Sequence, residues 1–207
     1  CTKLEFGTRS LFTVEHLLSA LAGCGLTHIC IEVCGEEIPL LDGSALKWVE
    51  AINKAGIIKA SHSHSPLYPI NDPITCYRGS SFITAIPSNK FRLISVIDFP
   101  QKVIGKQTFS IELTPESFVK EIAPARTFGF YDQIESLREQ GLIKGGGLHN
   151  ALVCDKDKWI NPPLRFENEP VRHKILDLIG DLAIVGFPRA QIFVYRGSHA
   201  LHADLAN

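Results

Sequence analysis

Three polar residues follow one another at helical spacing in the stretch PVRHKILDLIGDLAIVG, residues 170–186. His173, Asp177 and Asp181 stand four residues apart, so on a helix they share an arc of roughly 80°. A histidine and an aspartate one turn apart can bind a single metal ion. The alternative is a polar face turned to solvent, and this stretch taken alone favours that alternative.

The same stretch has the pattern of a helix that packs against a core. Apolar residues recur at the spacing of one helical face, at Val171, Ile175, Leu178, Ile179 and Leu182. Asn168 fits the capping position and Pro170 the first turn, whereas Gly186 and the proline after it would end the helix. Gly180 lies beside the polar stripe and would leave room above it.

A second helix is predicted from Val14 to about Gly23, with Thr13 as its cap. Its first turn carries Glu15 and His16. This adjacent pair is a weak signal of a metal site. A glutamate also stabilises the start of a helix, and a histidine there is often an ordinary polar residue.

Short strands and helices alternate over the rest of the chain, which indicates an α+β fold. A strand is predicted at 28–34 and a helix at 44–55. Further strands are predicted at 74–78, 81–86, 91–99, 107–113, 151–154 and 190–195. Further helices are predicted after the cap Thr114, at 131–140 and at 198–206. Ser88-Asn89-Lys90 is predicted to be a hairpin turn between two neighbouring strands.

The composition argues against several classes of protein. The 207 residues carry a net charge of −1 with both signs mixed, which does not suit a nucleic-acid-binding surface. No apolar run is long enough to span a membrane, and no signal peptide is recognisable. The six cysteines include no CxxC pair, so reduced thiols in the cytoplasm are expected. The chain starts at Cys1 and contains no methionine, so it is expected to be a fragment.

Five separated motifs occur in a fixed order: TVEHLLSALAG at 13–23, EIPLLDGSA at 37–45, ARTFGF at 125–130, LRFENEPVRHKILDLIGDL at 164–182 and GSHAL at 197–201. Together they resemble the UDP-3-O-acyl-N-acetylglucosamine deacetylase family (LpxC), the zinc hydrolases of lipid A biosynthesis, from about Cys1 to Asn207. The resemblance implies a two-domain β-α-α-β sandwich with the active site between the domains. Residues 1–60 would be the C-terminal part of an incomplete first domain, 61–72 a linker, and 73–207 a second domain with an acyl-passage insert around 125–151.

The resemblance also implies a role for each matching residue. The implied zinc ligands are His16, His173 and Asp177. The implied reaction groups are the general base Glu15, the general acid His199, the oxyanion holder Thr127 and the supporting Asp181. The implied substrate contacts are Lys174, the nucleotide and sugar contacts Phe128 and Phe130, and the acyl-chain contacts Ile134, Ile143 and Ala151. The last three could equally be core residues.

These residue types suit the chemistry of a metal-dependent amide hydrolase. Two histidines and one aspartate leave a fourth position on zinc for water, whose pKa falls from about 15.7 to roughly 7. Glu15 lies about 100° from His16 around the helix and could reach that water from the side. Fe²⁺ suits the same ligands, so the sequence leaves the native metal open.

Some positions depart from the family pattern, and the function has alternatives. Gly147, His149 and Gln133 differ from the residues common there, and His149 is either a substrate contact or a neutral change. The first hypothesis is deacetylation of the acylated UDP-sugar by a cytoplasmic monomer that needs no nucleic-acid partner. The others are a related metal-dependent amidase with another substrate and an inactive fragment.

Overall fold

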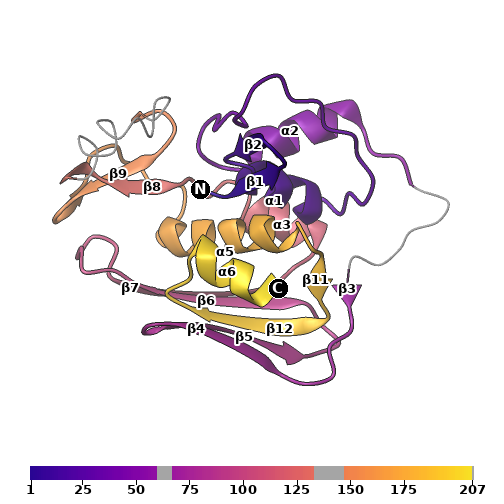
Figure 1. Cartoon of the computed structure of the whole chain (residues 1–207). Coiled ribbons are helices and arrows are strands. Elements are labelled where there is room, and N and C mark those ends of the chain that lie inside the picture. The colour runs from indigo at the N-terminus through magenta and orange to yellow at the C-terminus, as the bar shows by residue number, and fades with distance from the viewer. Residues whose placement is uncertain (60–66, 133–146, 207) are drawn as a thin grey trace.

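Helices and strands alternate along the chain, and the α+β fold predicted from the sequence is confirmed (Figure 1). The structure is a computed structural model that describes residues 1–59, 67–132 and 147–206. The helices include α1 (Glu15–Gly23), α2 (Leu46–Ala55), α3 (Pro115–Glu121), α5 (Glu169–Leu182) and α6 (His199–Ala206). None of the helices within these ranges is long and apolar enough to cross a membrane.

A five-stranded sheet lies on one side of the helices (Figure 1). Its strands, in spatial order, are β4 (Ile74–Arg78), β5 (Ser81–Pro87), β12 (Ala190–Tyr195), β6 (Arg92–Asp98) and β7 (Lys106–Glu112). β12 comes last in the sequence but occupies the centre, where it runs antiparallel to β5 and parallel to β6. All five strands lie within one or two residues of their predicted positions.

The hairpin turn predicted at Ser88-Asn89-Lys90 is wrong, because β12 lies between β5 and β6. Ile192 of β12 is paired with Ala85 on one side and with Leu93 on the other. Ile192 is fully buried, as befits a strand with neighbours at both edges. Turn residues indicate a reversal of the chain, but they do not determine which strands become neighbours in the sheet.

The helices form two layers on one face of this sheet (Figure 1). In the first layer, α5 and α6 contact the sheet. In the second layer, α1 packs on α5, and α2 contacts α1. The largest core cluster joins these layers through Ala20 of α1, Val49 of α2, Leu178 of α5, Leu201 of α6 and Ile192 of β12. The division of the chain into domains at 1–60, 61–72 and 73–207 stays a prediction.

The polar stripe of α5 is not exposed to solvent, because nearly the whole helix is buried. Every residue of α5 except Arg172 and Lys174 is buried. His173, Asp177 and Asp181 are 2%, 3% and 6% exposed. Because buried polar groups must find partners, this stripe has to be satisfied by other elements of the fold.

The α1 helix crosses α5 at Gly180. A Cβ atom at this glycine would lie 2.0 Å from the carbonyl oxygen of Glu15 and 2.7 Å from its carbonyl carbon. The room that Gly180 leaves is therefore filled by the backbone of α1. The missing side chain allows the start of α1, with Glu15 and His16, to lie directly on the polar stripe.

Three smaller sheets surround these layers. β1 (Lys3–Phe6) and β2 (Arg9–Phe12) form an antiparallel hairpin next to α1. β8 (Phe128–Phe130), β9 (Leu152–Asp155) and β10 (Lys158–Trp159) form a sheet in the order β10-β9-β8. β3 (Leu67–Tyr68), which lies within the predicted linker, pairs in parallel with β11 (Phe187–Pro188).

Two local predictions near α1 are wrong. Residues 28–34 form no strand, and every residue from 27 to 37 is exposed. Thr13 does not cap α1, because its φ of 60° places it outside the capping geometry and its hydroxyl donates to Glu37 at 3.0 Å. The predicted cap Thr114 is confirmed, since its hydroxyl accepts the backbone N–H of Ser117 at 3.1 Å.

Some predictions fall outside the described residues. They include most of the helix expected at 131–140 and the first part of the predicted linker, residues 61–66. They also include three single residues, Gln133, Ile134 and Ile143.

Candidate active site

Two histidines and an aspartate meet where α1 crosses α5. The rings of His16 and His173 lie edge to face with their centroids 5.0 Å apart. Oδ1 of Asp177 is 3.8 Å from Nε2 of His16 and 3.2 Å from Nε2 of His173. All three residues are buried, and one potential ligand atom from each lies within 4.8 Å of the others. The structure thus brings together the three residues predicted as metal ligands.

The protonation of these groups fits a bound metal ion. Nδ1 of His173 donates to the carbonyl oxygen of Ala125 at 3.0 Å, so Nε2 is the ring nitrogen that is turned toward Asp177. Burial and then the nearby His173 lower the pKa of His16 to about 3, so its ring is neutral at pH 7. Histidine nitrogens and a carboxylate oxygen are donors that a divalent zinc ion takes.

The carboxylate of Asp177 is held in its charged form by Lys174. Burial alone would raise the pKa of Asp177, but the charges of Lys174 and His173 outweigh it and hold that pKa well below its usual value. Nζ of Lys174 donates to Oδ2 at 2.7 Å, which leaves Oδ1 to face the two histidines. Lys174 therefore supports the cluster from the side away from the imidazoles.

Glu15 and Asp181 are linked through Thr2, a residue that the sequence did not single out. The backbone N–H of Thr2 donates to Oε2 of Glu15 at 3.0 Å. The Thr2 hydroxyl donates to Oδ1 of Asp181 at 2.5 Å. Glu15 is only 4% exposed, so the carboxylate predicted as the base lies beside His16 inside the same crossing of helices.

Asp181 is shared by two histidines of α6. Its Oδ2 lies 2.8 Å from Nδ1 of His199 and 2.7 Å from Nδ1 of His202. His202 was missed by the sequence analysis, although its position three residues after His199 places both on one side of a helix. The side chain of His199 is 30% exposed, whereas that of His202 is 1% exposed. His199 is therefore the histidine of the pair that a substrate can reach.

The pKa values of the two histidines shift in opposite directions. Burial lowers the pKa of His199, but its hydrogen bond to Asp181 and the charges of Asp177 and Asp181 outweigh burial and raise that pKa. In the more deeply buried His202, burial prevails over the same carboxylate and lowers the pKa. Hydrogen bonds from both rings outweigh burial in Asp181 and lower its pKa to about 2. The same carboxylate thus favours the protonated form of His199, whereas burial disfavours the protonated form of His202.

A pocket opens beside this cluster. Its polar end consists of Thr2, Asp181 and His199, and its apolar side includes Ile184 and Val185. Thr127 lies in another segment, between α3 and β8, and its backbone N–H donates to the carbonyl oxygen of Gly43 at 2.7 Å. The carboxylate–histidine pair of Asp181 and His199 therefore faces this cavity.

Comparison with known proteins identifies the family. The family model described as "LpxC: UDP-3-O-acyl N-acetylglycosamine deacetylase" matches residues 1–207. The chain belongs to this family. It is 53% identical over 207 residues to the UDP-3-O-acyl-N-acetylglucosamine deacetylase of Synechocystis, covering 99% of this chain and 75% of that protein. A relative of the same name from Trichormus variabilis is 52% identical over 210 residues, with the same two shares.

A plant relative extends this similarity. A protein of Arabidopsis thaliana named "Probable UDP-3-O-acyl-N-acetylglucosamine deacetylase 1, mitochondrial" is 44% identical over 228 residues, covering all of this chain and 70% of the plant protein. The resemblance to the LpxC family inferred from five motifs is therefore confirmed over the whole length of the chain.

Among the described residues that the LpxC resemblance assigns to the substrate, Lys174 and Phe128 contact the cluster. Phe128 and Phe130 are half-buried on β8, with ring centroids 5.4 Å and 5.8 Å from that of Phe99. The ring centroid of Phe128 is 6.4 Å from that of His173. Ala151 is half-buried directly before β9. His149 is exposed, and its ring would touch a Cβ added at Gly147.

Proposed function

We propose that this chain is a metal-dependent amide hydrolase that removes the N-acetyl group from an acylated UDP-N-acetylglucosamine. The carrying observation is the buried cluster of His16, His173 and Asp177, which lies next to a carboxylate, Glu15, and a carboxylate–histidine pair. A cation site with a base and an acid beside it is the arrangement that hydrolysis of an unactivated amide requires. Family membership and the names of the relatives support the choice of substrate.

We propose Zn²⁺ as the metal, with Fe²⁺ as the alternative, held by the three residues of the cluster. When bound, such an ion lowers the pKa of water and polarises the amide carbonyl. Glu15 accepts a proton from the attacking water, because its carboxylate adjoins His16 in the same buried turn. The Thr127 hydroxyl hydrogen-bonds the developing oxyanion.

His199 then donates its proton to the departing amine. Its Nδ1 is 2.8 Å from Asp181, so Nε2 is the nitrogen that carries the transferable proton. The negative charge of Asp181 raises the pKa of His199 and so favours the protonated ring that can act as the acid. Thr2 hydrogen-bonds both Asp181 and Glu15, which fixes the distance between acid and base.

Substrate recognition is assigned by analogy with the family. We propose that Phe128 and Phe130 contact the nucleotide and sugar, with Lys174 at the metal side. Ala151, together with Ile134 and Ile143, would line the acyl-chain passage. The reaction would then be the committed step of lipid A biosynthesis. The protein would act in the cytoplasm as a monomer.

Metal content and activity, measured together, test the proposal. The wild type should hold about one zinc ion per chain. It should also release acetate from the acylated UDP-sugar. His173→Ala should lose both properties, because it removes a ligand with few alternatives nearby. His28→Ala is the matched control, since His28 is an exposed histidine whose ring contacts Thr27, and it should keep both.

Each other outcome has a defined meaning. Zinc retained by His173→Ala contradicts the proposed ligands. Zinc bound without activity on this substrate favours the inactive fragment, and activity only on another amide favours a related amidase. Full activity after complete removal of metal refutes a metal-dependent mechanism.

A further inference from the structure

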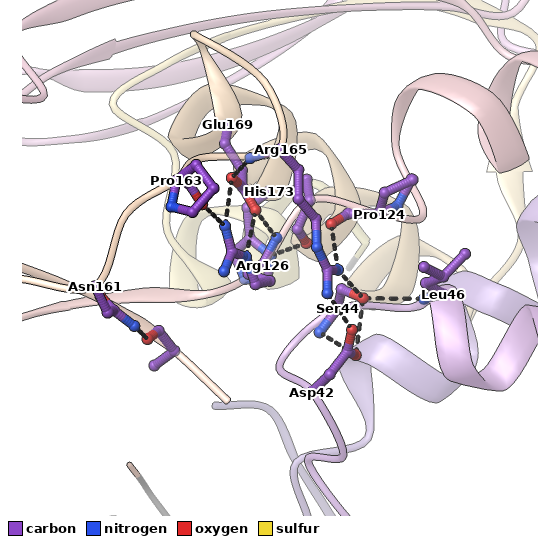
Figure 2. A network of polar contacts seen from close by, with 12 residues as sticks. Asp42, Ser44, Leu46, Pro124, Arg126, Asn161, Pro163, Arg165, Glu169 and His173 are labelled. Atoms are coloured by element: carbon purple, nitrogen blue, oxygen red, sulfur yellow. Dashed lines mark hydrogen bonds and ion pairs between the residues drawn. The ribbon is translucent and has the colours of Figure 1, made fainter. Parts of the chain in front are cut away.

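A buried glutamate at the start of α5 plays no part in the chemistry proposed above. Glu169 is 0% exposed. Its Oε1 accepts the backbone N–H of Arg126 at 2.9 Å and Nε of the same arginine at 2.8 Å. Its Oε2 accepts the backbone N–H of Arg165 at 2.6 Å and Nη2 of Arg126 at 3.1 Å. Figure 2 shows the carboxylate enclosed by these two segments.

The side chain of Arg165 extends the contacts of Glu169 to the loop before α2 (Figure 2). The guanidinium of Arg165 donates to Asp42 at 2.8 Å, to Ser44 at 3.2 Å and to the carbonyl oxygen of Pro124 at 2.8 Å. Ser44 is itself fully buried, and its hydroxyl accepts the backbone N–H at the start of α2. One carboxylate thus ties α5 to two separate loops.

The segment that Glu169 holds carries one contact to a proposed metal ligand and one residue with a proposed role in the reaction. On one side of Arg126, the carbonyl oxygen of Ala125 accepts Nδ1 of His173 at 3.0 Å. On the other side, Thr127 follows directly and is anchored by its N–H to Gly43. The backbone N–H that Glu169 accepts therefore lies between the group that orients a metal ligand and the proposed oxyanion donor.

Stability alone accounts poorly for this arrangement. Replacing a buried ion pair with apolar residues of similar volume is often neutral or stabilising, so such a pair is weak evidence of a stabilising role. Two of the four hydrogen bonds to Glu169 come from backbone N–H groups. A carboxylate bonded to the main chain fixes where that chain runs, which a simple pairing of side chains does not do.

We propose that Glu169 is a positioning residue for this site. By holding the backbone at Arg126, it sets the orientation of the His173 ring through Ala125 and the place of the Thr127 hydroxyl. The proposal rests on the function proposed above, since it assumes that His173 binds the metal. Outer contacts of metal-binding histidines commonly change metal affinity or activity about 10–100-fold when removed.

Glu169→Asp provides the main test, because it keeps the charge next to Arg126 but shortens the side chain by one carbon. We expect zinc affinity, measured by competition with a chelator, to fall by about 10–100-fold. We also expect kcat to fall while KM changes little, because the loss lies in groups that act in the transition state. Glu169→Gln should have an equal or larger effect.

Glu121→Gln is the matched control. Like Glu169, Glu121 forms an ion pair that links α5 to another segment. Nη1 of Arg172, on α5, donates to the carboxylate of Glu121 at 2.7 Å. We expect this variant to lose some stability in urea unfolding and to keep wild-type zinc affinity and kcat. A Glu169→Asp variant that unfolds earlier in urea but keeps both values would overturn the proposal and leave a purely structural ion pair.

Three further outcomes are distinguishable. If Glu169→Gln fails to fold, the affinity and kcat of Glu169→Asp still decide the matter. If the wild type binds zinc but does not deacetylate the UDP-sugar, the proposed function fails and the ratio of zinc affinities still tests Glu169. If the wild type binds no zinc, both proposals are overturned.

Discussion

Gly180→Ala should separate α1 from α5 and damage the site without touching any of its polar side chains. The added Cβ would lie 2.0 Å from the Glu15 carbonyl oxygen, whereas an ordinary contact begins near 3.4 Å. The backbone of α1 must therefore move by about 1.4 Å, the difference between these two distances. Glu15 and His16 move with it, because both stand in the first turn of that helix.

The magnitudes follow from this displacement. Overpacking costs about 1–3 kcal/mol, and alanine gains about 0.5–1 kcal/mol over glycine in a helix. The free energy of unfolding should therefore fall by about 1–2 kcal/mol, which shifts the urea midpoint by about 0.5–1 M for an m-value near 2 kcal/mol/M. A misplacement of about 1 Å in a catalytic constellation can cost about 100-fold in rate.

Urea unfolding, zinc content and the rate of acetate release measure these effects. Gly129→Ala is the control for stability, because a Cβ there meets no atom within 4 Å and its φ suits any residue. That variant should unfold within about 0.5 kcal/mol of the wild type. If Gly180→Ala matches the wild type in stability, zinc content and rate, then α1 does not lie on α5 as described.

Two more predictions concern pH and local stability. Because the pKa of His199 is raised by Asp181, the acid stays protonated until pH rises through that higher value, and activity is lost above it. Asp181→Asn should therefore move the alkaline limb of the pH–rate profile to lower pH, and an unmoved limb would assign it to metal-bound water. Hydrogen exchange should be faster in residues 27–37, which are exposed and form no strand, than in the central strand β12. Slower exchange in 27–37 would contradict the exposed conformation.

The sequence predicted those elements whose pattern is local. The apolar spacing of α5 and the alternation of β12 each specify an element from its own residues. The polar stripe of α5 was ambiguous, because the spacing of polar residues along a helix does not distinguish a solvent-exposed face from a buried one. Glu15 and His16 resolve it in the structure, since they come from another helix some 160 residues away in the sequence.

The failures share one physical origin, which is dependence on distant partners. Residues 88–90 have the composition of a hairpin turn, but the strands on either side of them, β5 and β6, are separated in the sheet by β12. Residues 28–34 alternate like a strand, but no strand forms in that part of the described chain. Glu169 and His202 looked like ordinary helix residues, and only their contacts to Arg126 and Asp181 give them significance.

The central place of β12 has a consequence for how the chain folds. β4 with β5 and β6 with β7 are pairs of strands close in sequence, so each can form as soon as its residues are available. The two pairs share no edge until residues 190–195 insert between them. Contacts between strands more than 90 residues apart close slowly. On a ribosome, the sheet would remain in two halves until nearly the whole described chain had emerged. The partially made chain would meanwhile present two unpaired strand edges, which is the state that a chaperone would bind.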